Sequence, residues 1–117
     1  MRSSAPAVLL DVDGTLVDST YHHTLSWARA LSAFDLVVPL WRIHRQIGKG
    51  GDRMVADLCG EEAERAHGEA IRAAQGERYG ELIGEVRPLP RAHELLRTLD
   101  EQGTTVVLAS SSKQEEL

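Results

Sequence analysis

The sequence has little cysteine and no long apolar run, and each shortage excludes a class of protein. Its 117 residues include one cysteine, Cys59, so no disulfide can form within the chain. A single unpaired cysteine fits a reducing compartment, and we expect a cytoplasmic protein. No apolar run approaches the length of a membrane span, so we expect no membrane partner. The apolar patch near the start is too short for a signal peptide, and Asp11 and Asp13 interrupt it.

Positive charge is also scarce. The chain has 13 lysines and arginines against 18 acidic residues, a net charge of −5. This balance argues against a general nucleic-acid binder, because such proteins usually carry a basic patch. Apolar residues make up 42% of the chain, which is typical of a globular protein and not of a disordered one. The length is sufficient for one domain with a modest core.

The most informative stretch is Ala7–Ser19, with the sequence A-V-L-L-D-V-D-G-T-L-V-D-S. Its apolar run Val8–Leu10, followed at once by Asp and Gly, predicts a fully buried strand that ends at a polar site. In open parallel sheets, ligands bind in the crevice beyond the carboxyl ends of the strands. A turn after the strand can aim the carboxylates of Asp11 and Asp13 into that crevice.

Two carboxylates this close repel each other unless a cation or a proton lies between them, which suggests a division of labour. One can stay ionised, bind a hard cation such as Mg²⁺, and attack phosphorus to give an aspartyl-phosphate. The other can carry a proton to the leaving group and later take one from water. Gly14 permits a close approach or an unusual backbone conformation, and Thr15 adds a hydroxyl and an amide for phosphate oxygens. The alternative is an acidic turn in which Asp and Gly serve only as turn formers.

Residues 19–86 predict helices throughout. The first helix has Ser19 or Thr20 available as its N-cap. His22 and His23 lie on it without further ligands at metal-binding spacing, so we expect them to be exposed or half-packed. Its apolar periodicity predicts one face formed by Tyr21, Leu25, Ala28, Leu31 and Ser32.

A glycine-rich turn, Gly48–Asp52, separates two of the predicted helices. Backbone amides, a helix N-terminus and the Lys49 ammonium converge there, which favours an anion site. The turn lacks the spacing of the nucleotide-binding P-loop, and a mobile loop with a solvated Lys49 is the alternative. A long helix from Glu61 to about Ile83 follows, and its several glycines weaken the helix prediction.

The composition changes at Val86–Pro90, where two prolines indicate a boundary. A helix that starts at Pro90 and a second buried strand, Thr104–Ala109, follow. That strand ends in three serines, of which Ser110 is the first. A hydroxyl at the carboxyl end of a strand suits a phosphate oxygen, although a serine cluster before a helix is, taken alone, usually a cap.

The first stretch, D-x-D-G-T-L-x-D-S, resembles the first signature of the haloacid dehalogenase-like phosphohydrolases, and V-V-L-A-S resembles their second. The resemblance implies that Asp11 is the nucleophile and a Mg²⁺ ligand. It implies that Asp13 is the general acid/base and that its main-chain carbonyl also binds the metal. It assigns phosphoryl binding to Ser110, together with the backbone amide of Ser111, and substrate contact to Lys49.

The resemblance also implies an α/β fold, a partial Rossmann-like core of parallel strands with an inserted α-helical cap. We expect residues 1–18 and 87–117 to form the core and residues 19–86 the cap. A lysine and a further acidic pair that the family needs normally follow the point where this sequence ends, so we expect the front part of a longer enzyme. The sheet edge left open by missing strands predicts self-association.

The predicted function is that of a Mg²⁺-dependent phosphatase acting on a small phosphorylated metabolite, of the phosphoglycolate or sugar-phosphate type. A sugar-phosphate mutase that uses the same aspartyl-phosphate is the alternative within the family. A truncated, non-catalytic module that binds phosphate or metal is the alternative from another class.

Overall fold

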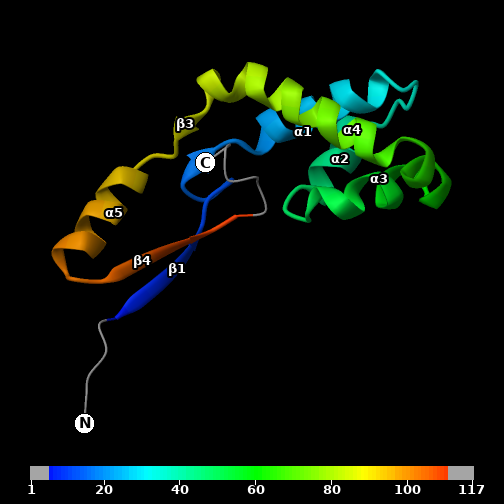
Figure 1. Cartoon of the computed structure of the whole chain (residues 1–117). Coiled ribbons are helices and arrows are strands. Elements are labelled where there is room, and N and C mark those ends of the chain that lie inside the picture. Colours follow the sequence, from blue (N-terminus) through cyan, green and yellow to red (C-terminus); the bar gives the residue numbers. More distant parts are fainter. Residues whose placement is uncertain (1–5, 111–117) are drawn as a thin grey trace, which may run out of the picture. The chain divides into compact units, whose positions relative to one another are not determined.

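The computed structural model describes residues 6–110 of the chain (Figure 1). The chain divides into two compact units. The first unit runs from the start of the described chain to Asp18 and continues from Arg87 to Ser110. The second unit is Ser19–Val86, which is helical. Parallel strands in one unit and helices in both confirm the predicted α/β fold class.

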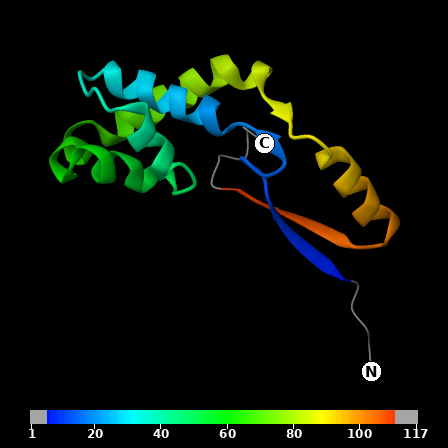
Figure 2. The same ribbon diagram turned by 180° about the vertical axis from the view of Figure 1, so that it is seen from behind.

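The first unit is built on two parallel strands, β1 (Ala7–Asp11) and β4 (Thr105–Ala109). They lie side by side in both views, with Ala7 opposite Thr105 and Asp11 opposite Ala109 (Figures 1 and 2). The β-branched residues of β4 favour the extended conformation. Helix α5 (Ala92–Glu101) precedes β4, so the chain returns to the sheet through a helix, as parallel pairing requires.

Two short strands pair within the first unit, at the points where the chain leaves this unit and where it returns to it. Strand β2 (Val17–Asp18) runs antiparallel to β3 (Arg87–Pro88), with Val17 opposite Pro88 and Asp18 opposite Arg87. The backbone N–H of Leu89 also donates to the carbonyl of Leu16 at 2.8 Å. The two connections to the helical unit are therefore held together by backbone hydrogen bonds.

The prediction that both long strands are fully buried is wrong. No residue of β1 is buried, Leu9 is 70% exposed, and Val107 of β4 is 48% exposed. Parallel strands are buried when both faces of their sheet are covered. Within residues 6–110 the sheet has only these two strands, and β1 has no strand on its other edge. Self-association through that edge stays a prediction.

The second unit contains four α-helices, α1 (Thr20–Ser32), α2 (Leu40–Gln46), α3 (Gly51–Cys59) and α4 (Glu61–Leu82), and a 3₁₀ helix, η1 (Ile83–Glu85). Helix α4 packs against both α1 and α3, and Figure 2 shows these helices from behind. No helix within residues 6–110 combines the length and apolar character needed to cross a membrane. The buried core of this unit consists of Trp27, Ala30, Leu31, Ile43, Met54, Val55, Leu58 and Ile71.

The buried face of α1 differs from the predicted one. Tyr21 is 59% exposed, whereas His23, expected at the surface or half-packed, is 8% exposed and stacks on Tyr79 with ring centroids 4.0 Å apart. Small polar residues also lie inside because their hydroxyls find partners. Thr24 donates to the carbonyl of Thr20 at 2.8 Å, and buried Ser26 donates to the carbonyl of His23 at 2.8 Å. The pattern of apolar residues alone therefore predicts the wrong buried face for this helix.

Replacing Leu31 by Ala should destabilise the helical unit by about 2–5 kcal/mol, because the side chain is fully buried and a cavity would remain. Leu40→Ala is the matched control, since Leu40 is 51% exposed, and its effect should stay within about 0.5 kcal/mol. Urea denaturation followed by circular dichroism measures both. Equal effects of the two substitutions would contradict this description of the core.

Candidate active site

A tight turn carries the two acidic residues of the first motif. Asp11 is the last residue of β1, and the carbonyl of Val12 accepts hydrogen bonds from the N–H groups of the three residues Thr15, Leu16 and Val17. The Val12 and Leu16 side chains are buried and anchor the turn. Asp11 is exposed and Asp13 is half-buried, so both carboxylates remain within reach of a ligand.

Gly14 provides the conformation that the turn needs. Its φ is 77°, in the left-handed region that other L-residues enter only at a cost. Its N–H donates to the carbonyl of Val17 at 2.9 Å, which closes the turn. The glycine is therefore required by backbone geometry, as its position directly after Asp13 in the sequence suggested.

Each carboxylate accepts a hydrogen bond from a hydroxyl group. Thr15 Oγ1 donates to Asp11 Oδ2 at 3.0 Å, and Ser110 Oγ donates to Asp13 Oδ2 at 3.0 Å. The second bond joins residues that are far apart in the chain, and sheet register explains it. Because Asp11 lies opposite Ala109, the next residue, Ser110, emerges beside the turn. Asp11, Asp13, Thr15 and Ser110 thus meet at the carboxyl edge of the two parallel strands, where open α/β sheets bind ligands.

The oxygen-rich donor set fits a hard cation. Among residues 6–110 there is no group of three or more His, Cys, Asp or Glu side chains able to hold a metal. At this edge, the carboxylate of Asp11 and an oxygen of Asp13 could hold such an ion. Mg²⁺ is typically bound through one or two carboxylates and keeps several waters, so these residues fit that ion.

The other predicted site residues are placed differently. Lys49 belongs to the helical unit, where its side chain is 55% exposed and its Nζ lies 3.7 Å from an Asp57 carboxylate oxygen. Ser111, predicted to offer its backbone amide to phosphate, lies outside the described residues. The hydrogen bond from Ser110 to Asp13 was not predicted. The sequence did contain a signal for this contact, because both motifs directly follow predicted strands of one parallel sheet.

Comparison with known proteins identifies the family of this architecture. A model of the haloacid dehalogenase-like hydrolases, a hydrolase family, matches residues 5–117. The structure of a hydrolase from Pseudomonas syringae is 34% identical, with a TM-score of 0.87, and the match covers 93% of this chain and 50% of that one. No curated protein matches.

Two further solved structures share the fold. One, described as a predicted phosphoglycolate phosphatase from Haemophilus somnus, is 25% identical with a TM-score of 0.78, and the match covers 97% of this chain and 54% of that one. Another, described as a candidate β-phosphoglucomutase from Bacteroides vulgatus, is 22% identical with a TM-score of 0.81, over 96% and 47% of the two chains. The chain thus spans about half the length of the structures it matches.

Substituting Gly14 by Ala should destabilise the first unit by about 1–2 kcal/mol, because alanine must adopt the left-handed conformation. Gly14→Asn is the comparison, since asparagine enters this region more readily than alanine, and it should cost less. Thermal and urea unfolding of both variants measures the difference. An alanine variant as stable as the parent would show that the turn does not need this conformation.

Proposed function

The chain belongs to the haloacid dehalogenase-like hydrolase family, and from this premise we propose that it is a Mg²⁺-dependent phosphatase of a small phosphorylated metabolite. One observation carries the proposal. The hydroxyl of Ser110, at the end of β4, reaches the carboxylate of Asp13, in the turn after β1, at 3.0 Å. This contact supports a single site built from the two sequence motifs, in which Asp11 would be the nucleophile and Asp13 the second carboxylate, with hydroxyl donors beside them. Phosphoryl transfer depends mainly on such positioning and on charge neutralisation.

In the first step, the Asp11 carboxylate attacks the phosphorus atom of the substrate. A bond forms between phosphorus and the carboxylate oxygen, and the bond from phosphorus to the leaving oxygen breaks. Asp13, in its protonated form, gives its proton to the leaving oxygen, and the alcohol departs. Thr15 orients Asp11 through its hydrogen bond, which keeps one carboxylate oxygen fixed and the other available for attack.

In the second step, water attacks the phosphorus of the aspartyl-phosphate on Asp11. Asp13 takes a proton from this water, the acyl–phosphate linkage opens, and inorganic phosphate leaves with Asp11 regenerated. Before substrate binds, the hydrogen bond from Ser110 holds the Asp13 carboxylate in place. When substrate binds, the single hydroxyl proton of Ser110 would turn to a phosphoryl oxygen and release Asp13 for proton transfer. Bound Mg²⁺, held by Asp11 and Asp13, would neutralise the phosphate charge.

The helical unit supplies the remaining part of the proposal. In the role of a cap domain, it would exclude water and contact the part of the substrate away from the phosphate. Lys49 suits the second task, because its ammonium is exposed and its pairing with Asp57 is long at 3.7 Å. Exposed pairs of this kind contribute little free energy, so an anionic substrate can replace Asp57 as the partner.

Asp11→Asn should abolish phosphate release from an aryl phosphate in the presence of Mg²⁺, because the amide is a poor nucleophile. Asp13→Asn should lower kcat by about 10²–10⁴-fold, the contribution typical of general acid–base catalysis. Colorimetric phosphate detection measures both. Asp100→Asn, an exposed acidic residue in α5, is the matched control and should retain parental activity. Turnover by Asp11→Asn at the parental rate would refute the assigned nucleophile.

Chelation by EDTA should reduce phosphate release to the level of Asp11→Asn, and excess Mg²⁺ should restore it. The physical reason is that, without a cation, two neighbouring carboxylates repel an anionic substrate. Isothermal titration with Mg²⁺ provides a separate measurement, in which Asp11→Asn should bind the ion more weakly. Full activity in EDTA would contradict a metal-dependent site.

Product analysis distinguishes the two alternatives from hydrolysis. A sugar-phosphate mutase would form the same aspartyl-phosphate but return the phosphoryl group to a sugar, so free phosphate would not accumulate. A non-catalytic module would bind phosphate or Mg²⁺ without releasing phosphate from any ester. Accumulation of free phosphate that requires Asp11 supports the phosphatase over both.

A further inference from the structure

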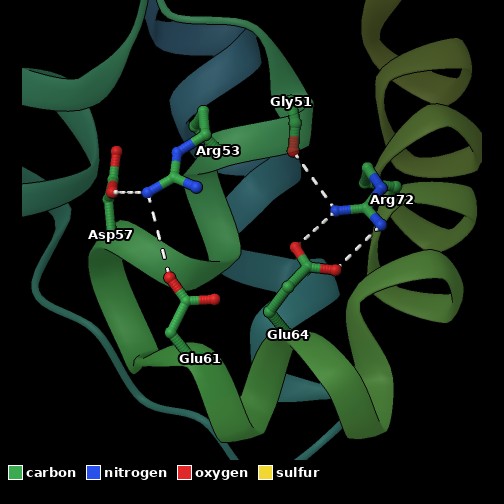
Figure 3. A network of polar contacts seen from close by, with 6 residues as sticks. All are labelled: Gly51, Arg53, Asp57, Glu61, Glu64 and Arg72. Atoms are coloured by element: carbon green, nitrogen blue, oxygen red, sulfur yellow. Dashed lines mark hydrogen bonds and ion pairs between the residues drawn. The ribbon is translucent and has the colours of Figure 1, made fainter.

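The glycine-rich turn that carries Lys49 leads into Gly51, the first residue of α3, and two side chains lie close to this glycine. A Cβ added to Gly51 would lie 3.3 Å from the Trp27 indole and 3.9 Å from Cδ of Arg72. Arg72 Nη1 also donates to the Gly51 carbonyl at 3.5 Å (Figure 3). The Gly51 backbone is thus in close contact with a core aromatic residue and with the Arg72 guanidinium group.

Arg72 is itself held by a bidentate ion pair. Its Nη1 and Nη2 donate to the two carboxylate oxygens of Glu64 at 2.7 Å and 3.0 Å (Figure 3). The side chains of Arg72 and Glu64 are 28% and 22% exposed, and paired hydrogen bonds of this geometry are among the stronger polar contacts in proteins. These hydrogen bonds lower the pKa of the Glu64 carboxyl and raise the pKa of Arg72.

The spacing of this pair is unusual, and Gly68 explains it. Glu64 and Arg72 are eight positions apart on α4, which corresponds to about 12 Å along a helix, twice the usual separation of side chains that pair. Gly68 lies midway and is buried, and a Cβ placed on it would clash with the Glu64 carboxylate. Glu64 therefore extends along the helix through the space that the missing side chain leaves open.

The other charged pairs around the loop are weaker. Arg53 contacts Asp57 at 3.2 Å and Glu61 at 3.9 Å, but its side chain is 60% exposed (Figure 3). Lys49 is 55% exposed and meets Asp57 at 3.7 Å. Exposed ion pairs of this kind contribute little to the free energy of folding. The strong ion pair with Glu64 thus holds the Arg72 guanidinium, and Arg72 in turn reaches the Gly51 carbonyl through a longer contact of 3.5 Å, while the Lys49 ammonium stays loosely paired.

We propose that Arg72 is a positioning residue. Held by Glu64 across Gly68, it contacts the carbonyl of Gly51 at the start of α3 and so positions the preceding glycine-rich turn, which carries Lys49 for an anionic substrate. The part of this inference that concerns substrate rests on the proposed phosphatase function. The part that concerns the loop does not, and it can be measured without turnover.

Gly68→Ala tests the inference because it displaces the Glu64 carboxylate without removing either charge or creating a cavity. We expect hydrogen–deuterium exchange at the amides of residues 50–53 to accelerate by about three- to tenfold. KM for the aryl phosphate should rise by about three- to tenfold while kcat changes less than about twofold, since loop contacts bind substrate rather than drive chemistry. Gly80→Ala is the matched control on the same helix, where an added Cβ meets nothing within 4 Å, and both readouts should stay at parental values.

A second background separates displacement of Glu64 from any other effect of the new methyl group. In a Glu64→Ala protein the space over Gly68 is empty, so adding Gly68→Ala should cause no further change in exchange or KM. Arg72→Lys, which keeps the charge but not the paired hydrogen bonds, should reproduce the Gly68→Ala effects. Unchanged exchange in both Gly68→Ala and Arg72→Lys would overturn the inference.

The two proposals fail in distinguishable ways. If the parent releases no phosphate, the phosphatase function fails, and the exchange measurement alone decides whether Arg72 positions the loop. If exchange accelerates in Gly68→Ala but KM remains at the parental value, the loop is held by Arg72 but does not position a substrate contact, and the inference is overturned.

Discussion

The parallel pairing of β1 with β4 is the constraint on which the candidate site depends. The register places Asp11 opposite Ala109, so Asp13 and Ser110 emerge together although most of the chain separates them. A slip of one residue would turn every side chain of β4 to the other face and carry Ser110 away from Asp13. The geometry of the candidate site is thus set by the backbone hydrogen bonds between the two strands, and the turn after β1 completes it.

The helical unit relies on a different kind of constraint. Its core is apolar and fully buried at Leu31, Ile43 and Ile71, whereas the strands of the first unit are partly exposed within the described residues. Beside this core, Glu64 and Arg72 form a partly buried ion pair, and Arg72 also contacts the backbone carbonyl of Gly51, next to the glycine-rich turn. Apolar packing therefore gives the unit its stability, and a polar contact gives one loop its position.

Sequence reasoning was most successful where a local pattern determines the structure. The apolar run followed by the Asp–x–Asp–Gly turn predicted both the strand and its polar end, because backbone preference and site chemistry act over the same few residues. It failed where distant partners decide. Burial of β1 depends on neighbouring strands, and His23 lies inside because Tyr79 from another helix stacks on it. The Glu64–Arg72 ion pair was not predicted, because ion pairs on a helix are expected between residues three or four positions apart. A glycine within a helix is also usually taken as a sign of low helix stability and not as space for a neighbouring side chain.

The antiparallel pairing of β2 with β3 has a consequence for how such a protein can change. The two connections to the helical unit lie opposite each other, at Asp18 and Arg87, at the spacing of a β-hairpin. A turn of a few residues would therefore join them without disturbing the strand register or the acidic turn. In this sense the helical unit is an insertion between the two paired strands β2 and β3. A change in the length of this unit would therefore leave the pairing of β2 with β3 and the turn after β1 in place.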